Sequence, residues 1–173
     1  MKKHTLRITL AALFTAMSII IGIFCKTFLN FDGGLLRISF ESLPIILSGI
    51  MFGPIAGGLV GAGSDLISYL LSPQTYPPNL IVTLGCAMLG ICAGVVSRYL
   101  LKSKGYARLV VSCVSAHVIG SMIIKTVGLF QFYQWATLVR IPIYVAIAIL
   151  ESILICVLYK NSSFRRLMER YEL

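Results

Sequence analysis

Residues 41–71, ESLPIILSGIMFGPIAGGLVGAGSDLISYLL, decide the fold, because two apolar runs meet there at Gly53-Pro54. Proline cannot continue a helix that began before it, and glycine commonly ends one. The pair therefore predicts one helix over 41–52 and another over 55–71. At ~1.5 Å per residue, the first is short for a hydrocarbon layer of ~30 Å. We expect the preceding loop to extend it or its neighbours to bury it.

The rest of the chain has the same apolar character. Of its 173 residues, 58% are hydrophobic and 12% are charged, and the mean hydropathy is +0.92. Soluble domains are about 45–50% apolar and about 25% charged, so an ordinary soluble enzyme and a disordered regulator are both excluded. At ~20 residues per span, the length allows about six helical spans. We expect one all-α membrane domain over 1–173, with spans at 6–28, 41–52, 55–71, 79–101, 106–130 and 137–159, Asn79 as the N-cap of the fourth, and a polar amphipathic tail.

The basic residues predict the orientation of these spans. If both termini are cytoplasmic, eleven of the fifteen Lys and Arg residues lie on the inner side, as the positive-inside rule requires. They also account for the net charge of +9 as contacts to anionic membrane lipid, without a nucleic-acid partner. The eleven are Lys2, Lys3, Arg7, Arg98, Lys102, Lys104, Arg108, Lys160, Arg165, Arg166 and Arg170.

Four cations remain on the outer side: Lys26, Arg37, Lys125 and Arg140. Lys125 lies more than a turn inside its predicted helix, and a cation at the centre of a bilayer costs about 2.5–3.5 kcal/mol on insertion scales. An anionic ligand would offset this cost. An internal ion pair with Asp65 or Glu151 would do the same, and both hypotheses stay open here.

Helical phase supports a shared polar region in the outer halves of several spans. Four helices each present a stripe of small, aromatic or ionisable residues, namely Gly58, Ala62, Asp65 and Tyr69; Asn79 and Thr83; His117, Ser121 and Lys125; and Arg140, Tyr144, Ile147 and Glu151. His117 is interpreted as a hydrogen-bonded core histidine without a companion His or Cys. The five cysteines are interpreted as small buried residues.

Small residues recur at four-residue spacing, which lets helices approach closely. Internal packing is the interpretation for Gly53, Gly57 and Gly61 and for Gly90 and Gly94, whereas Ala12 and Ala16 can also form a docking face. The sequence contains no nucleophile elbow, Walker A or HExxH motif and no paired carboxylates at helical spacing. We expect no enzyme activity, no metal and no cofactor, so a solute-concentrating transporter would need energy from a partner or an ion gradient.

The run LRISFESLPIILSGIMFGP (36–54), continued by GGLVGAGSDL (57–66), closely resembles the substrate-binding S components of energy-coupling factor (ECF) vitamin transporters. IIKTVGL (123–129) and RIPIY (140–144) are similar to their folate-specific, FolT-like branch. The segment SPQTYPP (72–78) departs from the Gly-rich turn common in that branch.

This resemblance implies a prokaryotic multi-pass protein of the cell membrane with six helices and outer loops that close over a vitamin. It implies that Ala12 and Ala16 match the AxxxA motif that engages the scaffold protein EcfT. Two cytoplasmic ATPases would supply the energy, and the whole S component would topple in the bilayer to carry the vitamin inward.

Folate, bound with high affinity, fits the candidate residues. Its glutamyl tail is a dianion that suits the outer cations, its pterin edge suits a carboxylate, Asp65 or Glu41, and its ring suits aromatic stacking. The candidate substrate-binding residues are Arg37, Phe40, Glu41, Asp65, Asn79, Lys125, Trp135, Arg140 and Tyr144. The alternatives are an S component for another vitamin, such as thiamine or riboflavin, and a ligand-free structural membrane protein.

Overall fold

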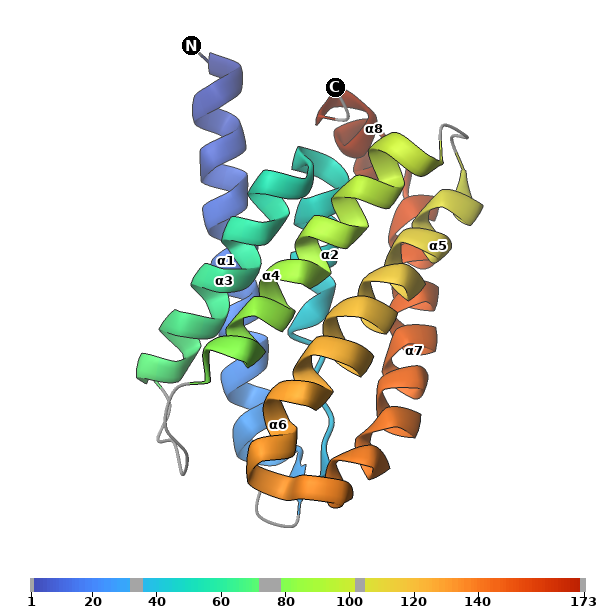
Figure 1. Cartoon of the computed structure of the whole chain (residues 1–173). Helices are drawn as coiled ribbons and strands as arrows, with labels where there is room; N and C mark the ends of the chain where they lie inside the picture. Colours follow the sequence, from blue (N-terminus) through green and yellow to red (C-terminus); the bar gives the residue numbers. More distant parts are fainter. Residues whose placement is uncertain (1, 32–35, 72–78, 102–104, 172–173) are drawn as a thin grey trace.

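The computed structural model is a bundle of helices with both termini at one end (Figure 1). It describes residues 2–31, 36–71, 79–101 and 105–171. We call the end that carries the termini the terminal end, and the opposite end, which carries the strands β1 and β2, the hairpin end. The segment 72–78 lies outside the described residues.

The helices follow the predicted spans closely. The elements are α1 (Lys2–Phe28), α2 (Ser42–Phe52), α3 (Pro54–Leu71), α4 (Leu80–Val95), η2 (Val96–Leu100), α5 (Tyr106–Ala116), η3 (His117–Lys125), α6 (Thr126–Tyr133), η4 (Gln134–Val139), α7 (Arg140–Lys160) and α8 (Ser162–Tyr171). The segments η2 and η3 are π-helical and continue α4 and α5, whereas η4 is a 3-10 turn that leads into α7. A short antiparallel pair, β1 (Asn30–Phe31) with β2 (Leu36–Arg37), was not predicted.

Five helical stretches are long and apolar enough to cross a membrane in the described part of the chain: Thr5–Phe28, Pro54–Leu71, Leu80–Leu100, Tyr106–Gln131 and Gln134–Lys160. Helix α2 has 11 residues, and every residue from Pro44 to Met51 is buried. The expectation that neighbours bury this short helix is therefore confirmed. The last helix, α8, packs on α7 and α2 through the fully buried Met168.

The break between α2 and α3 occurs at the predicted pair. Gly53 has φ 98°, a conformation that side chains other than glycine rarely adopt. Pro54 then begins α3, a position where its missing N–H is not needed. The Arg98 guanidinium lies over Gly53 and donates from Nη2 to the Met51 carbonyl at 3.2 Å. The reversal is therefore held both by backbone geometry and by a cation at the carboxyl end of α2.

Glycines let α2, α3 and α4 touch backbone to backbone. A Cβ atom added to Gly90 would collide with the backbone of Gly57, and one added to Gly94 would lie 2.5 Å from the Pro54 nitrogen. A Cβ on Gly57 would lie 2.6 Å from the Gly49 Cα. The predicted packing role of the glycines on α3 and α4 is thus confirmed, and it also extends to α2.

Candidate functional site

A buried ion pair joins α2 to η3 toward the hairpin end. Lys125 is the last residue of η3, and its side chain lies over Gly85 of α4, where an added Cβ would stand 2.6 Å from the lysine Cγ. The Lys125 Nζ lies 3.6 Å from Oε1 of Glu41, the residue that precedes α2. Their side chains are 10% and 14% exposed. A charge-assisted N⁺–H···O⁻ hydrogen bond is about 2.7–2.9 Å long. At 3.6 Å, the Lys125 and Glu41 side chains therefore form an ion pair without a short hydrogen bond.

The carboxylate beside Lys125 differs from the two that the sequence suggested. The Asp65 Oδ2 accepts a hydrogen bond from the Thr83 hydroxyl at 2.7 Å, and no ion pair joins Asp65 to Lys125 among the described contacts. Tyr144 is half-buried on α7. Glu151 accepts from Ser42 and contacts His117, which precedes Lys125 by eight residues on the same continuous helix. The short α2 explains the difference, since it starts inside the bundle and so brings Glu41 to the depth of Lys125.

The first helix closes one side of this centre. A Cβ on Gly22 would stand 2.8 Å from the Glu41 Oε2 and 3.5 Å from the Ser68 hydroxyl. Lys26, one turn further along α1, donates to the same Ser68 hydroxyl at 2.8 Å. Neither Gly22 nor Ser68 was predicted. Small residues on α1 and α3 were the available signal, but their role depends on which helices pack together.

Arg140 is a second buried cation near the hairpin end. It is the first residue of α7, is 8% exposed, and its guanidinium carbon lies 5.1 Å from the centre of the Tyr133 ring. Thr137, one turn earlier in η4, is fully buried, and its hydroxyl has no hydrogen-bond partner among the described residues. Tyr133 was missed because η4 folds back on α6, which helical phase within one span cannot show.

Known proteins now identify the family. Residues 6–164 match the family described as the substrate-specific component of ECF transporters. The chain belongs to this family of S components. It is 32% identical over 82 residues to the folate transporter FolT of Clostridium novyi (strain NT), a match that covers 46% of this chain and 48% of that one. The match thus spans about half the length of that relative.

The fold of this S component is also that of a solved relative. A crystal structure of FolT bound with folic acid has a TM-score of 0.67 with this chain, at 24% sequence identity, and the match covers 91% of this chain and 95% of that one. The S-component fold expected from the sequence is therefore confirmed, and the chain is a multi-pass membrane protein.

The other candidate residues of the S component have varied surroundings. Asn79 is the N-cap of α4, as predicted, because its Oδ1 accepts from the Ile81 N–H at 3.0 Å, and its Nδ2 donates to the Gly128 carbonyl at 2.6 Å. Phe40 is half-buried ahead of α2. Arg37 lies in β2, but its side chain is outside the described residues. Trp135 is 74% exposed and packs edge-on against Phe130, with ring centres 5.6 Å apart.

The proposed docking residues lie on the outside of the S component. Ala12 and Ala16 are both exposed on α1. Several large apolar side chains of the same helix are also exposed, including Ile8, Leu13 and Ile20. This face of α1 is therefore largely uncovered by the described part of the chain.

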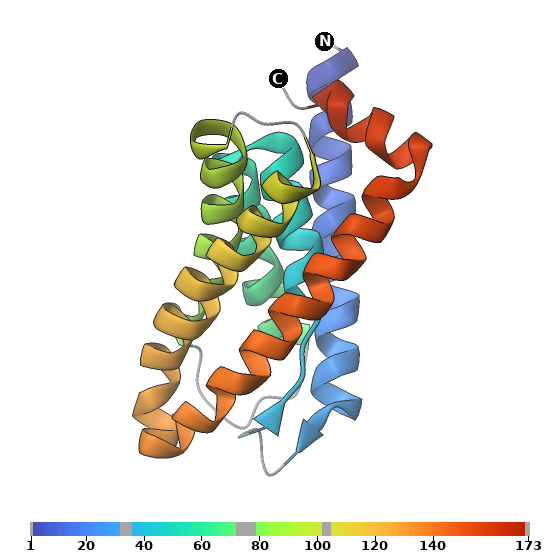
Figure 2. The same cartoon turned by 90° about the vertical axis from the view of Figure 1, so that its right-hand side faces the viewer.

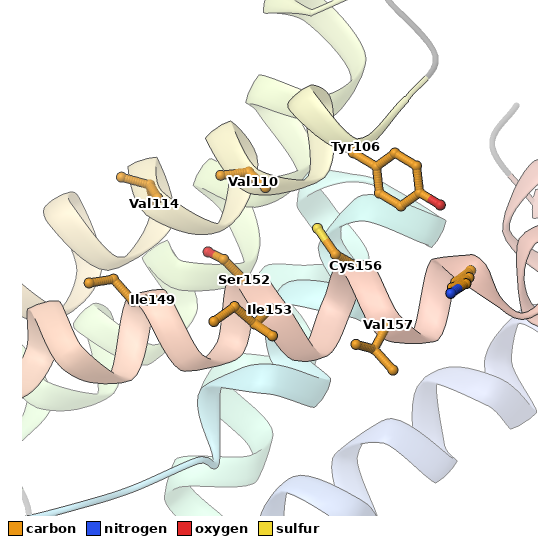
Figure 3. A pocket seen from close by; sticks show the side chains of 9 residues that line it. Tyr106, Val110, Val114, Ile149, Ser152, Ile153, Cys156 and Val157 are labelled. Carbon is orange, nitrogen blue, oxygen red and sulfur yellow. The ribbon is translucent and has the colours of Figure 1, made fainter.

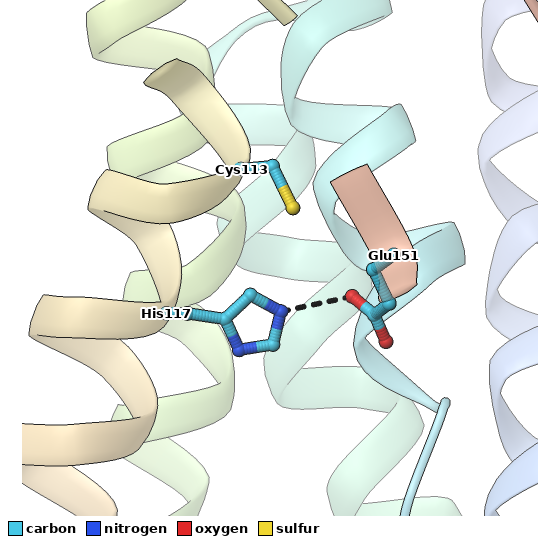
Figure 4. A group of neighbouring side chains, drawn as sticks. All are labelled: Cys113, His117 and Glu151. Carbon is cyan, nitrogen blue, oxygen red and sulfur yellow. Dashed lines mark hydrogen bonds and ion pairs between the residues drawn. The ribbon is translucent and has the colours of Figure 1, made fainter. Parts of the chain in front are cut away.

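The expectation that His117 has no companion cysteine is wrong. Cys113 lies one turn earlier on the same continuous helix, and Glu151 faces both from α7 (Figure 4). The His117 Nε2 lies 2.9 Å from the Glu151 Oε2, and all three residues are buried. The i, i+4 spacing of Cys113 and His117 was the signal in the sequence.

A separate groove of about 520 Å³ runs along the outside of the S component between α5 and α7 (Figure 3). Its lining is almost entirely apolar, and the side chains of Ile149, Ile153 and Val157 are each more than half exposed. Lys160 and Tyr106 lie at its terminal end. The groove therefore faces lipid and lacks the polar groups that orient a vitamin.

Proposed function

We propose that this S component binds folate with high affinity at the hairpin end and delivers it inward with an ATP-driven coupling module. The main support for this proposal is a pair of buried cations near this end, Lys125 on η3 and Arg140 on α7. Lys125 makes a 3.6 Å contact with Glu41, so a substrate carboxylate can approach it without breaking a short, closed ion pair.

The charge at this end suits a dianion. Among the side chains that the structure describes, two cations are buried there, Lys125 and Arg140. The two carboxylates of the glutamyl tail would supply one anion to each of them. A thiamine cation would instead add a positive charge beside them, and a neutral riboflavin would supply no counter-ion, which is costly at membrane depth.

Different residues at this end are assigned to different parts of the folate molecule. We assign the glutamyl tail to Lys125, Arg140 and Arg37, and the donor edge of the pterin to Asp65, whose carboxylate is oriented by Thr83. Tyr144, Phe40 and Trp135 supply faces for stacking. Asn79 contributes by tying α4 to the segment that follows Lys125, and Glu41 holds Lys125 in place before the ligand arrives.

A vitamin panel tests the substrate. The detergent-purified protein is melted with saturating folate, thiamine or riboflavin, because a ligand at 100 times its dissociation constant stabilises the folded state by about 2.7 kcal/mol. We expect folate to raise the melting temperature and the other two vitamins to leave it unchanged. A rise with thiamine or riboflavin would contradict the folate assignment, and no rise with any of the three would favour a ligand-free structural protein.

The proposed partners are the scaffold protein EcfT and two cytoplasmic ATPases in a prokaryotic cell membrane, with both termini of this chain on the cytoplasmic side. The exposed Ala12 and Ala16 support docking by α1, because small residues four apart allow close helix contact. The double variant Ala12→Leu/Ala16→Leu should lose co-purification with EcfT and keep folate binding. Ala146→Leu, at an exposed position of α7, is the control and should keep both. Lost folate binding with the complex intact would refute the docking role.

A further inference from the structure

The structure assigns a binding site for a divalent metal ion of the zinc type to Cys113, His117 and Glu151, in the middle of the bundle (Figure 4). This assignment is independent of the proposed vitamin. The candidate ligand atoms are one sulfur, one imidazole nitrogen and one carboxylate oxygen, and all lie within 4.8 Å of one another. Thiolate, imidazole and carboxylate are the three donor types that zinc uses in proteins.

The spacing of these donors is close to that of a bound site. With metal–ligand bonds of about 2.0–2.3 Å, the ligand atoms of a tetrahedral zinc site stand about 3.3–3.6 Å apart. The His117 Nε2 and Glu151 Oε2 are 2.9 Å apart, slightly too close. The Cys113 sulfur points toward their contact in Figure 4. The proposed site therefore requires these side chains to rotate to bonding distance when the ion enters.

Outer hydrogen bonds already orient two of the three ligands. The Ser42 hydroxyl donates to the Glu151 Oε1 at 2.6 Å, and the Ser121 hydroxyl lies 3.4 Å from the His117 Nδ1. A metal-binding histidine usually bonds its second ring nitrogen to such a partner, and ligating carboxylates are hydrogen-bonded as well. This leaves His117 Nε2 and the Glu151 Oε2 facing each other, with the Cys113 thiol, which donates to the Ala148 carbonyl at 3.9 Å, beside them.

Charge favours an ion at this depth. Glu151 is fully buried and lies nine residues before the end of α7. His117 is 1% exposed and lies at the start of η3. A divalent cation with one thiolate, one carboxylate and one neutral imidazole forms a group of zero net charge, which lowers the cost of burying the carboxylate in a membrane. The ion would fasten α5 and η3 to α7, and through Ser42 to α2.

Cobalt substitution tests the site. The purified protein is stripped with a chelator and titrated with Co²⁺, which gives a near-ultraviolet charge-transfer band when a thiolate binds it. We expect one Co²⁺ per chain, displacement of the band by Zn²⁺, and loss of the band in Cys113→Ser. Cys156→Ser is the matched control, because Cys156 lines the groove on the outer side of α7, and it should keep the band.

Two further readouts cover variants that fold poorly. Ser121→Ala leaves all three ligands in place and should weaken Zn²⁺ binding by roughly ten- to a hundredfold. Zn²⁺ should also raise the melting temperature of the unmodified protein but not that of Cys113→Ser. A wild-type protein that takes up no Co²⁺, or a band that persists in Cys113→Ser, would overturn the assignment and leave a hydrogen-bonded cluster.

Discussion

The face formed by α2, α3 and α4 and the one formed by η3, α6 and α7 are built on opposite principles. In the first, Gly49, Gly57 and Gly90 bring backbones into contact and leave no room for a Cβ atom. In the second, buried polar side chains such as Lys125, Arg140 and Glu151 contact groups on other elements. The glycine face therefore serves as a rigid support, whereas the polar face holds the groups that can change partners when a ligand binds.

The largest effect should come from breaking the glycine face. In Gly90→Ala the new methyl group meets the Gly57 backbone, which cannot rotate away, so we expect a loss of about 3 kcal/mol or more in the free energy of unfolding. Gly63→Ala is the control, because nothing lies within 4 Å of its added Cβ, and alanine should stabilise α3 by up to about 1 kcal/mol. Thermal melting of both variants checks this. Equal stability of the two would contradict the account of the support.

On the polar face, Lys125→Ala should weaken folate binding by about ten- to a hundredfold, since a charge-assisted hydrogen bond contributes about 1.5–3 kcal/mol. Lys160→Ala, at the terminal end of α7, is the control and should bind normally. Isothermal titration gives the affinities. If Lys125 only balances Glu41, its loss should lower the melting temperature of the ligand-free protein and leave the affinity close to wild type.

A smaller effect is expected where the two faces meet. Asn79 caps α4 and bonds to the Gly128 carbonyl of α6, so Asn79→Ala should lower the free energy of unfolding by about 1–2 kcal/mol. Asn79→Asp keeps the capping oxygen but removes the donor to Gly128, and should recover part of that loss. Chemical denaturation of both variants measures how much the cap bond to Ile81 and the bond to Gly128 each contribute to the free energy of unfolding. An unaffected Asn79→Ala would show that neither bond contributes to stability.

The smallest effect concerns a side chain at the edge of the polar face. Trp135 is the single tryptophan of the chain and is 74% exposed, so closure of η4 over folate should bury it and quench its fluorescence in a saturable way. A titration with folate measures this, with riboflavin as the control for inner-filter absorption. A spectrum that stays unchanged at saturating folate would place Trp135 away from the ligand.

The sequence could predict the features that depend on neighbours along the chain. Gly53-Pro54 ended one helix and began another, Asn79 capped α4, and the polar stripe of η3 is buried at His117, Ser121 and Lys125. Each depends on backbone chemistry or on helical phase within one span. The same reasoning predicted helical ranges whose ends lie within a few residues of the observed helix boundaries.

Partners across the bundle could not be predicted in the same way. The contact of Lys125 with Glu41 depends on the depth at which α2 begins, and that of Arg140 with Tyr133 depends on the turn of η4. The proximity of Glu151 to His117 likewise needs the packing of α7 on η3. The residues were visible in the sequence, but which helices face one another is set by packing across the bundle.

The π-helical segment η3 affects how this chain is to be aligned with others. Its backbone bonds each enclose one residue more than those of an α-helix. One residue can therefore be deleted between His117 and Lys125 by a return to α-helical geometry, without breaking the span. Because the wide π turn holds the extra residue, such a deletion would leave the residues before and after the segment on their present helix faces. An alignment that places a one-residue gap within residues 117–125 therefore keeps the two ends of this span in correspondence, although the two sequences differ in length there.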